Sequence, residues 1–91
     1  TLHTLYLSDN EICTGGAIEI FKALCINTTL HRLYLDYNSI CTKGAAEIPN
    51  MLCANNSLHT LDLSYTKIGV EGIIEISKSL FINTLYLGGN N

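Results

Sequence analysis

Apolar residues recur along this chain every 28 positions, and their local spacing changes part-way through each unit. The segments 5–7, 33–35 and 61–63 alternate in and out as short strands do, with Leu at both ends of each. Apolar residues at positions 17, 20, 21 and 24 then follow the i, i+3, i+4, i+7 spacing of a helix with one buried face. Each unit is therefore predicted to be a strand, a turn, a helix and a return loop.

The period divides the 91 residues into repeats at about 1–28, 29–56 and 57–84, with a partial repeat at 85–91. One such unit cannot bury its own apolar face, so each must pack on its neighbours. We therefore expect one α/β domain with parallel strands. Neither end carries a polar cap, and the chain starts in mid-pattern at Thr1, so we expect it to be a fragment of a longer array.

The stretches LHTLYLSDNEI, LHRLYLDYNSI and LHTLDLSYTKI, each followed by a helix with Gly-Ala or Gly-Ile at its start, resemble leucine-rich repeats. The 28-residue length and helical second half are similar to the ribonuclease-inhibitor subtype, also found in the sensor domains of NOD-like receptors. The resemblance covers residues 2–83 in full and 85–90 in part. It implies a right-handed solenoid, a horseshoe segment with strands on the concave side and helices on the convex side. It implies little about function, because members of the family bind unrelated partners.

Several positions depart from this pattern. The resemblance implies that an Asn amide at each turn bonds the backbone of adjacent repeats, a role that fits Asn10, Asn38 and Asn90 and that Thr66 can fill only in part. Pro49 falls inside the second predicted helix and should kink or shorten it. The return before Leu85 lacks four residues and is expected to be tight or irregular.

The starts of the helices give two further expectations. Thr14 and Thr42 stand where an N-cap is wanted. Cys13 and Cys41 replace the glycine that the family places after the turn isoleucine, whereas Gly69 keeps it, so the first two turns are expected to differ slightly in path.

Composition narrows the function classes. A net charge of -3, without a cluster of Lys or Arg, gives no electrostatic footprint for nucleic acid or an anionic membrane. The apolar runs are too short to cross a bilayer, and the first residues show no secretion signal. We expect no cofactor.

Histidines and cysteines could suggest chemistry, but their spacing argues against it. His3, His31 and His59 share one repeat position, which predicts a column with rings about 5 Å apart rather than the tetrahedron that zinc takes. Cys25 lies near the loop to His31 but lacks a buried orienting acid for a triad. We therefore predict neither a metal site nor an enzyme, while a metal column and a thiol nucleophile remain as lesser alternatives.

The four cysteines are interpreted as small apolar residues in a reducing compartment, which predicts a cytoplasmic protein. Cys25 and Cys53 should stay unbridged. Asn27-Thr28-Thr29 and Asn55-Asn56-Ser57 match the N-glycosylation pattern, but polar return loops produce this triplet by chance.

The residues between the buried leucines form columns on the predicted concave sheet. Tyrosine and arginine are enriched at interface hot spots, whereas the plainer interpretation is a hydrated sheet that uses tyrosine for strand propensity. We predict a non-catalytic module that binds a protein partner; the alternative is a structural or autoinhibitory array whose own chain supplies the partner. On the convex side, Ile18, Ile74 and Phe81 suggest a second contact surface. The predicted binding residues are Tyr6, Arg32, Tyr34, Asp36, Tyr37, Asp62, Tyr65 and Tyr86.

Overall fold

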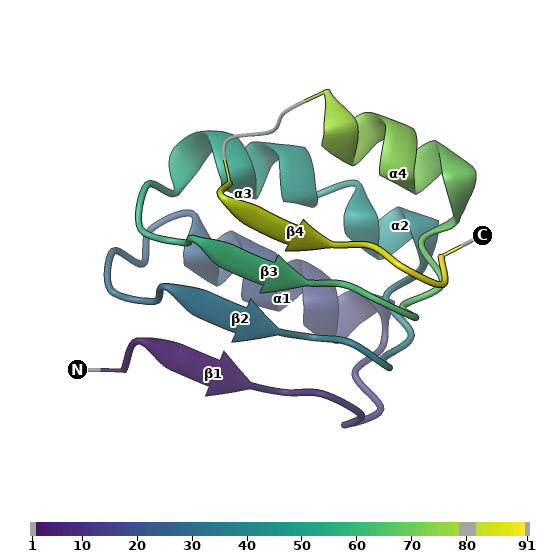
Figure 1. Ribbon diagram of the computed structural model, residues 1–91, viewed down its shortest axis with the longest axis horizontal. Coiled ribbons are helices and arrows are strands. Elements are labelled where there is room, and N and C mark those ends of the chain that lie inside the picture. The colour runs from purple at the N-terminus through teal and green to yellow at the C-terminus, as the bar shows by residue number, and fades with distance from the viewer. Residues whose placement is uncertain (1, 79–81, 91) are drawn as a thin grey trace.

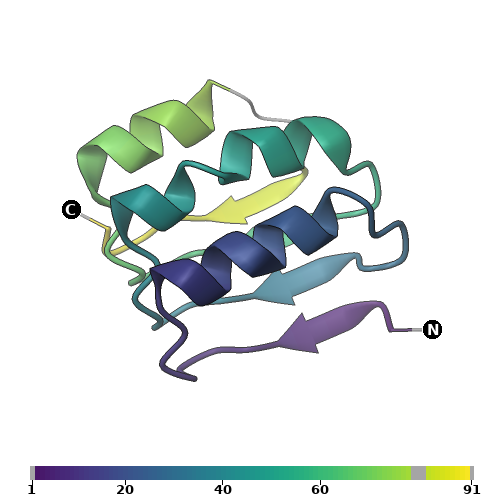
Figure 2. The same cartoon turned by 180° about the vertical axis from the view of Figure 1, so that it is seen from behind.

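The computed structural model describes residues 2–78 and 82–90. These residues form one parallel sheet and one layer of helices. The strands lie in the order β1-β2-β3-β4, and the helices all cover the same face of the sheet (Figures 1 and 2). The predicted α/β class with parallel strands is therefore confirmed. The elements, in chain order, are β1 (Thr4–Tyr6), α1 (Thr14–Leu24), β2 (Arg32–Tyr34), α2 (Cys41–Ala45), α3 (Ile48–Ala54), β3 (Thr60–Asp62), α4 (Gly69–Ser77) and β4 (Thr84–Tyr86).

The strand register follows the sequence period. Leu5 pairs with Leu33, and Leu33 pairs with Leu61, each 28 positions on. The last step is shorter, because Leu61 pairs with Leu85. The four missing residues thus fall in the return from α4 to β4. Residues 79–81 of this return, among them Phe81 of the predicted second contact surface, lie outside the described residues, so the expected irregularity is not tested.

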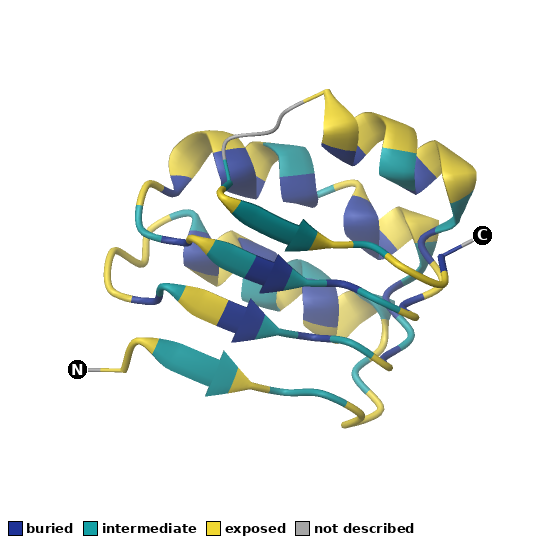
Figure 3. Ribbon diagram, viewed as in Figure 1, coloured by how far each residue is buried: buried dark blue, intermediate teal, exposed yellow. Residues whose placement is uncertain are grey.

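The core fills the space between the sheet and the helices. Leu33 of β2 and Leu61 of β3 are fully buried there, in the dark blue segments of Figure 3, and so are four isoleucines of repeats 2 and 3: Ile40, Ile48, Ile68 and Ile76. The same repeat positions in repeat 1 are only partly buried, because β1 is at the edge of the sheet. Leu2 is 58% exposed, whereas its equivalent Leu30 is 6% exposed. This edge is apolar, as the missing polar cap predicts.

Pro49 divides the second helix, as predicted. α2 ends at Ala45, α3 begins at Ile48, and Pro49 occupies the first turn of α3. Proline has no amide hydrogen and is tolerated in a first turn, where that hydrogen has no partner within the helix. Repeat 2 therefore carries two short helices where repeats 1 and 3 carry one.

The prediction that Thr14 and Thr42 cap the helices is wrong. Neither α1 nor α2 has a side-chain cap, and each threonine lies inside its helix. Instead, the hydroxyl of Thr14 donates to the carbonyl of Ile40, and that of Thr42 donates to the carbonyl of Ile68. The threonines link adjacent repeats, because stacking brings the next repeat's carbonyl within reach of each hydroxyl.

Asparagine amides join adjacent turns. The Oδ1 of Asn38 accepts from the backbone N–H groups of Asn10 and Ile12 at 3.0 and 2.9 Å, and its Nδ2 donates to the carbonyls of Leu7 and Leu35, both at 2.9 Å. Asn90 makes the equivalent bonds to repeat 3. The predicted role is confirmed for these two residues.

The same role is not tested for Asn10, whose Nδ2 donates, within the described residues, to the carbonyl of Ser8 in its own turn. Asn10 belongs to the edge repeat, so no described strand precedes it. Thr66 keeps only the part of the role that lies within its own repeat, because its hydroxyl donates to the carbonyl of Leu63, and its other bond is to the side-chain amide oxygen of Asn90. Among the described residues, its side chain makes no bond to repeat 2.

The expected difference in turn path holds for Cys13 but not for Cys41. Cys13 has extended backbone with φ of -99°, whereas Cys41 at φ of 64° follows the left-handed path of Gly69 at 77°. A left-handed conformation costs an L-residue roughly 1–2 kcal/mol. Cys41 therefore keeps the glycine's path at the cost of backbone strain.

Candidate protein-binding surface

The face of the sheet opposite the helices carries the predicted columns of side chains. Thr4, Arg32, Thr60 and Thr84 lie in one register column, and Tyr6, Tyr34, Asp62 and Tyr86 lie in the next. Backbone hydrogen bonds continue past the strands, since Asp9 N–H donates to Asp36 and Tyr37 N–H donates to Ser64. We call this surface, together with the turns that follow the strands and carry Asp36, Tyr37 and Tyr65, the exposed sheet face. It brings together all the predicted binding residues: Tyr6, Arg32, Tyr34, Asp36, Tyr37, Asp62, Tyr65 and Tyr86.

Two pairs of stacked tyrosines dominate the exposed sheet face. The rings of Tyr6 and Tyr34 are 4.6 Å apart and 5° from parallel, and those of Tyr37 and Tyr65 are 4.8 Å apart and 7° from parallel. Tyr6, Tyr37 and Tyr65 are all more than half exposed. Stacking restricts the rings without burying them. They are thus preorganised apolar surface, which reduces the entropy lost when a partner binds.

The backbone that carries one of these pairs is strained. Tyr37 and Tyr65 have φ of 59° and 55°, in the left-handed region that bulky residues avoid. Gly89 occupies the same repeat position at φ of 70°. A Cβ on Gly89 would come within 2.4 Å of the Tyr65 ring, so this ring lies directly on the glycine. The turn thus favours glycine, yet two repeats place a tyrosine there. Strained backbone of this kind is common at functional sites.

Carboxylates lie among the tyrosines. The side chain of Asp36 accepts a 2.5 Å hydrogen bond from the hydroxyl of Ser8, and that of Asp62 accepts from the backbone N–H of Ser64 at 3.0 Å. These bonds fix both acids in place. With Arg32 on the same face, the surface offers polar groups of both signs beside its aromatic rings.

Two stretches match models of known families: residues 1–24 match one described as Leucine Rich Repeat, and residues 54–77 match one described as Leucine Rich repeat. The chain carries leucine-rich repeats. A comparison with curated proteins found no match to this chain. The two matched stretches contain β1 with α1 and β3 with α4, so the family pattern coincides with the strand and helix of repeats 1 and 3. Proteins with such repeats are generally protein-interaction modules and are typically not enzymes.

The histidines of the three repeats form the predicted column. The ring centroids of His3 and His31 are 4.7 Å apart, and those of His31 and His59 are 5.2 Å apart. Partial burial lowers the pKa of His31, and the positive charges of His3, His59 and Arg32 lower it further. Within residues 2–78 and 82–90, no three His, Cys, Asp or Glu side chains gather as metal ligands.

The lowered pKa of His31 predicts that the repeats lose stability in mild acid. The neutral imidazole's contribution is complete above the ordinary histidine pKa of about 6.5 and is lost as the pH falls through the lower folded-state pKa. We expect the urea midpoint to be lower at pH 5 than at pH 7.5. His31→Gln should shrink this difference, and an identical pH profile for the variant would contradict the role of His31.

The structure also bears on the cysteines, on the glycosylation triplet at Asn55 and on the length of the helices. All four cysteines are free, as expected for Cys25 and Cys53. Asn55 is buried, and its Nδ2 donates to the carbonyls of Leu24 and Asn27. The amide nitrogen that a glycan would need is therefore used in hydrogen bonds between repeats. None of the helices in the described ranges has the length and apolar character of a transmembrane span.

Sequence reasoning missed the strain and the stacking. The columns predicted which residues are neighbours, but not that the backbone of Tyr37 and Tyr65 is left-handed. One signal was present: aligning the repeats sets Asp9, Tyr37 and Tyr65 against Gly89. A glycine in one repeat marks a position where positive φ is favourable.

Proposed function

We propose that this leucine-rich repeat protein is a non-catalytic module that binds a protein partner on the exposed sheet face. We further propose that the repeats belong to the ribonuclease-inhibitor-like subtype and form a solenoid segment whose concave surface is that face. The observation that carries the binding proposal is the pair Tyr37 and Tyr65, exposed and stacked on backbone that glycine would occupy with less strain.

The chemistry of the face supports a protein as the partner. Tyrosine gives a large contact area with only two rotatable bonds, and its hydroxyl can bond polar groups at the rim of an interface. Asp36 and Asp62, held by hydrogen bonds, and Arg32 would set the register of the partner.

The four free thiols support a reducing compartment, and we propose a cytoplasmic location. Cys13 and Cys53 are exposed, where an oxidising environment would leave them open to pairing between molecules. The expected result is that all four thiols react with an alkylating reagent added as the cells are lysed, before air can oxidise them.

Glycine substitution separates binding from folding. Tyr37→Gly and Tyr65→Gly should each leave stability unchanged or raise it, because relief of a strain of roughly 1–2 kcal/mol offsets the lost ring contact. Each should weaken the binding of a partner by about 2 kcal/mol, or roughly 30-fold in affinity, as the loss of a hot-spot residue does. A partner obtained by affinity selection on the immobilised chain can be measured by calorimetry.

Asp9→Gly is the matched control, because Asp9 has the same left-handed backbone at φ of 53° but no aromatic ring. It should leave the affinity within about twofold. Full affinity in the double variant Tyr37→Gly, Tyr65→Gly would contradict the proposed site and favour a structural array.

A further inference from the structure

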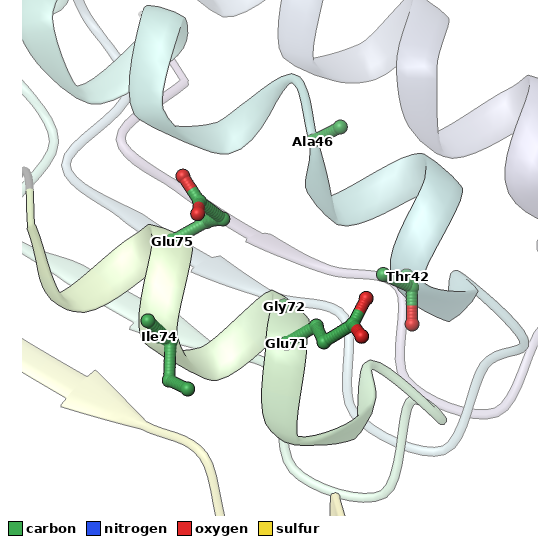
Figure 4. Close-up of a pocket in the computed structure, with 6 residues that line it drawn as sticks. All are labelled: Thr42, Ala46, Glu71, Gly72, Ile74 and Glu75. Carbon is green, nitrogen blue, oxygen red and sulfur yellow. The ribbon is translucent and has the colours of Figure 1, made fainter.

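A hollow of about 330 Å³ lies in the helix layer, on the opposite side of the sheet from the exposed sheet face. We call it the helix-layer groove. It opens between α2 and α4, and Figure 4 shows the side chains around it. Its lining residues are Thr42, Ala46, Glu71, Gly72, Ile74 and Glu75.

The groove results from a small residue at one repeat position. Ala46 is the equivalent of Ile18 in repeat 1 and Ile74 in repeat 3. Its methyl group leaves open the volume that an isoleucine would fill. α2 ends just before Ala46, and Gly72 adds no side chain to the opposite wall. The groove therefore exists because repeat 2 lacks the large side chain that repeats 1 and 3 have at this position.

The wall formed by α4 combines apolar surface with negative charge. Ile74 is 48% exposed, and the carboxylates of Glu71 and Glu75 both extend from α4, that of Glu71 toward Thr42 of α2 (Figure 4). Lys78 pairs with Glu75 at 3.3 Å. Lys43, the repeat equivalent of Glu71, does not line the groove, and in the described residues Glu71 has no ion pair.

We infer that the helix-layer groove binds a segment of a partner protein that carries a Lys or Arg beside a Leu or Ile. The aliphatic side chain would occupy the space above Ala46 and Gly72, against Ile74. The cation would pair with Glu71 while its methylene stem covers the exposed part of Ile74. An acidic segment would meet two carboxylates. This inference concerns another face and does not rest on the proposed function.

NMR titration of the full chain with three capped tripeptides tests the chemistry. We expect Leu-Arg-Leu to shift the amide signals of Ala46, Gly72 and Glu75. Leu-Glu-Leu should bind about tenfold more weakly, because repulsion replaces attraction, and Gly-Arg-Gly should lose the apolar contact to a similar extent. Equal binding of the three peptides, or shifts confined to the exposed sheet face, would overturn the inference.

Two substitutions test the place. Ala46→Ile supplies the residue of the neighbouring repeats, so the fold should persist while the groove is filled and Leu-Arg-Leu binding is lost. Glu71→Gln should weaken binding about threefold, whereas Glu19→Gln, in the helix layer of repeat 1, should leave it unchanged. An unchanged thermal midpoint for Ala46→Ile keeps the result interpretable. Undiminished binding by folded Ala46→Ile would overturn the inference.

Discussion

Asn38→Ala is expected to lower the free energy of unfolding by about 3–4 kcal/mol. The amide of Asn38 accepts from two backbone N–H groups of repeat 1 and donates to one carbonyl of repeat 1 and two of repeat 2. The side chain is only 4% exposed, so water cannot replace these bonds without opening the turn. Urea denaturation followed by circular dichroism measures the loss, which is a large part of the stability of a domain of this size.

Asn10→Ala is the matched control, because Asn10 holds the same repeat position but is exposed, and among the described residues its side-chain amide bonds only the carbonyl of Ser8 in its own turn. Its effect should be within about 0.5 kcal/mol. Equal losses in the two variants would show that the amide acts within its own turn, and the joint between repeats 1 and 2 would then need another explanation.

Thr66→Asn should act in the opposite direction and stabilise the protein by about 1 kcal/mol. An asparagine at this position could accept from the backbone N–H groups of Asn38 and Ile40 and donate to the carbonyl of Leu35, as Asn38 does one repeat earlier. The equivalent positions 38 and 90 already bury an asparagine, so the space has a precedent. A lower urea midpoint would show that the turn of repeat 3 cannot accept the amide.

Gly72→Ala is expected to lower the free energy of unfolding by about 2 kcal/mol, the second large effect. A Cβ on Gly72 would lie 2.1 Å from the Cγ2 of Ile68. Ile68 is fully buried and β-branched, so its methyl group has little freedom to move aside. Overpacking should exceed the roughly 1 kcal/mol that alanine gains over glycine in a helix. A fall of about 8–16 °C in thermal midpoint is the corresponding result.

The equivalent glycines give a graded comparison. At Gly44 the closest approach of a Cβ would be 2.8 Å, to Ile40, and at Gly16 it would be 3.4 Å, to the half-buried Ile12. Gly16→Ala should therefore be neutral or stabilise α1 by up to about 1 kcal/mol, and Gly44→Ala should fall between the two. An order of stability other than Gly16, Gly44, Gly72 would refute the steric argument.

Much of the fold follows from the sequence because its period is regular. Once Leu5, Leu33 and Leu61 are aligned, stacking fixes the parallel register, and the register fixes the columns of the exposed sheet face. Pro49 was sufficient to predict a kinked or shortened second helix, because a missing amide hydrogen and a steric clash are local properties of the residue.

Other features depended on contacts between repeats and were not predictable in this way. Thr14 has the residue type of a cap, but stacking places the carbonyl of Ile40 2.9 Å from its hydroxyl. Asn10 has the residue type of a joining asparagine, but no described repeat precedes it. Ala46 appeared unremarkable until the helices were packed, because a hollow depends on what surrounds a small side chain.

The uneven distribution of amide joints has a mechanical consequence. Asn38 and Asn55 both fasten repeat 2 to repeat 1, and Asn90 fastens the last turn to repeat 3. Across the described boundary between repeats 2 and 3, no asparagine amide reaches over, because Thr66 occupies the place of one. A molecule pulled along the stack would first part at this seam, leaving two halves that each stay internally fastened.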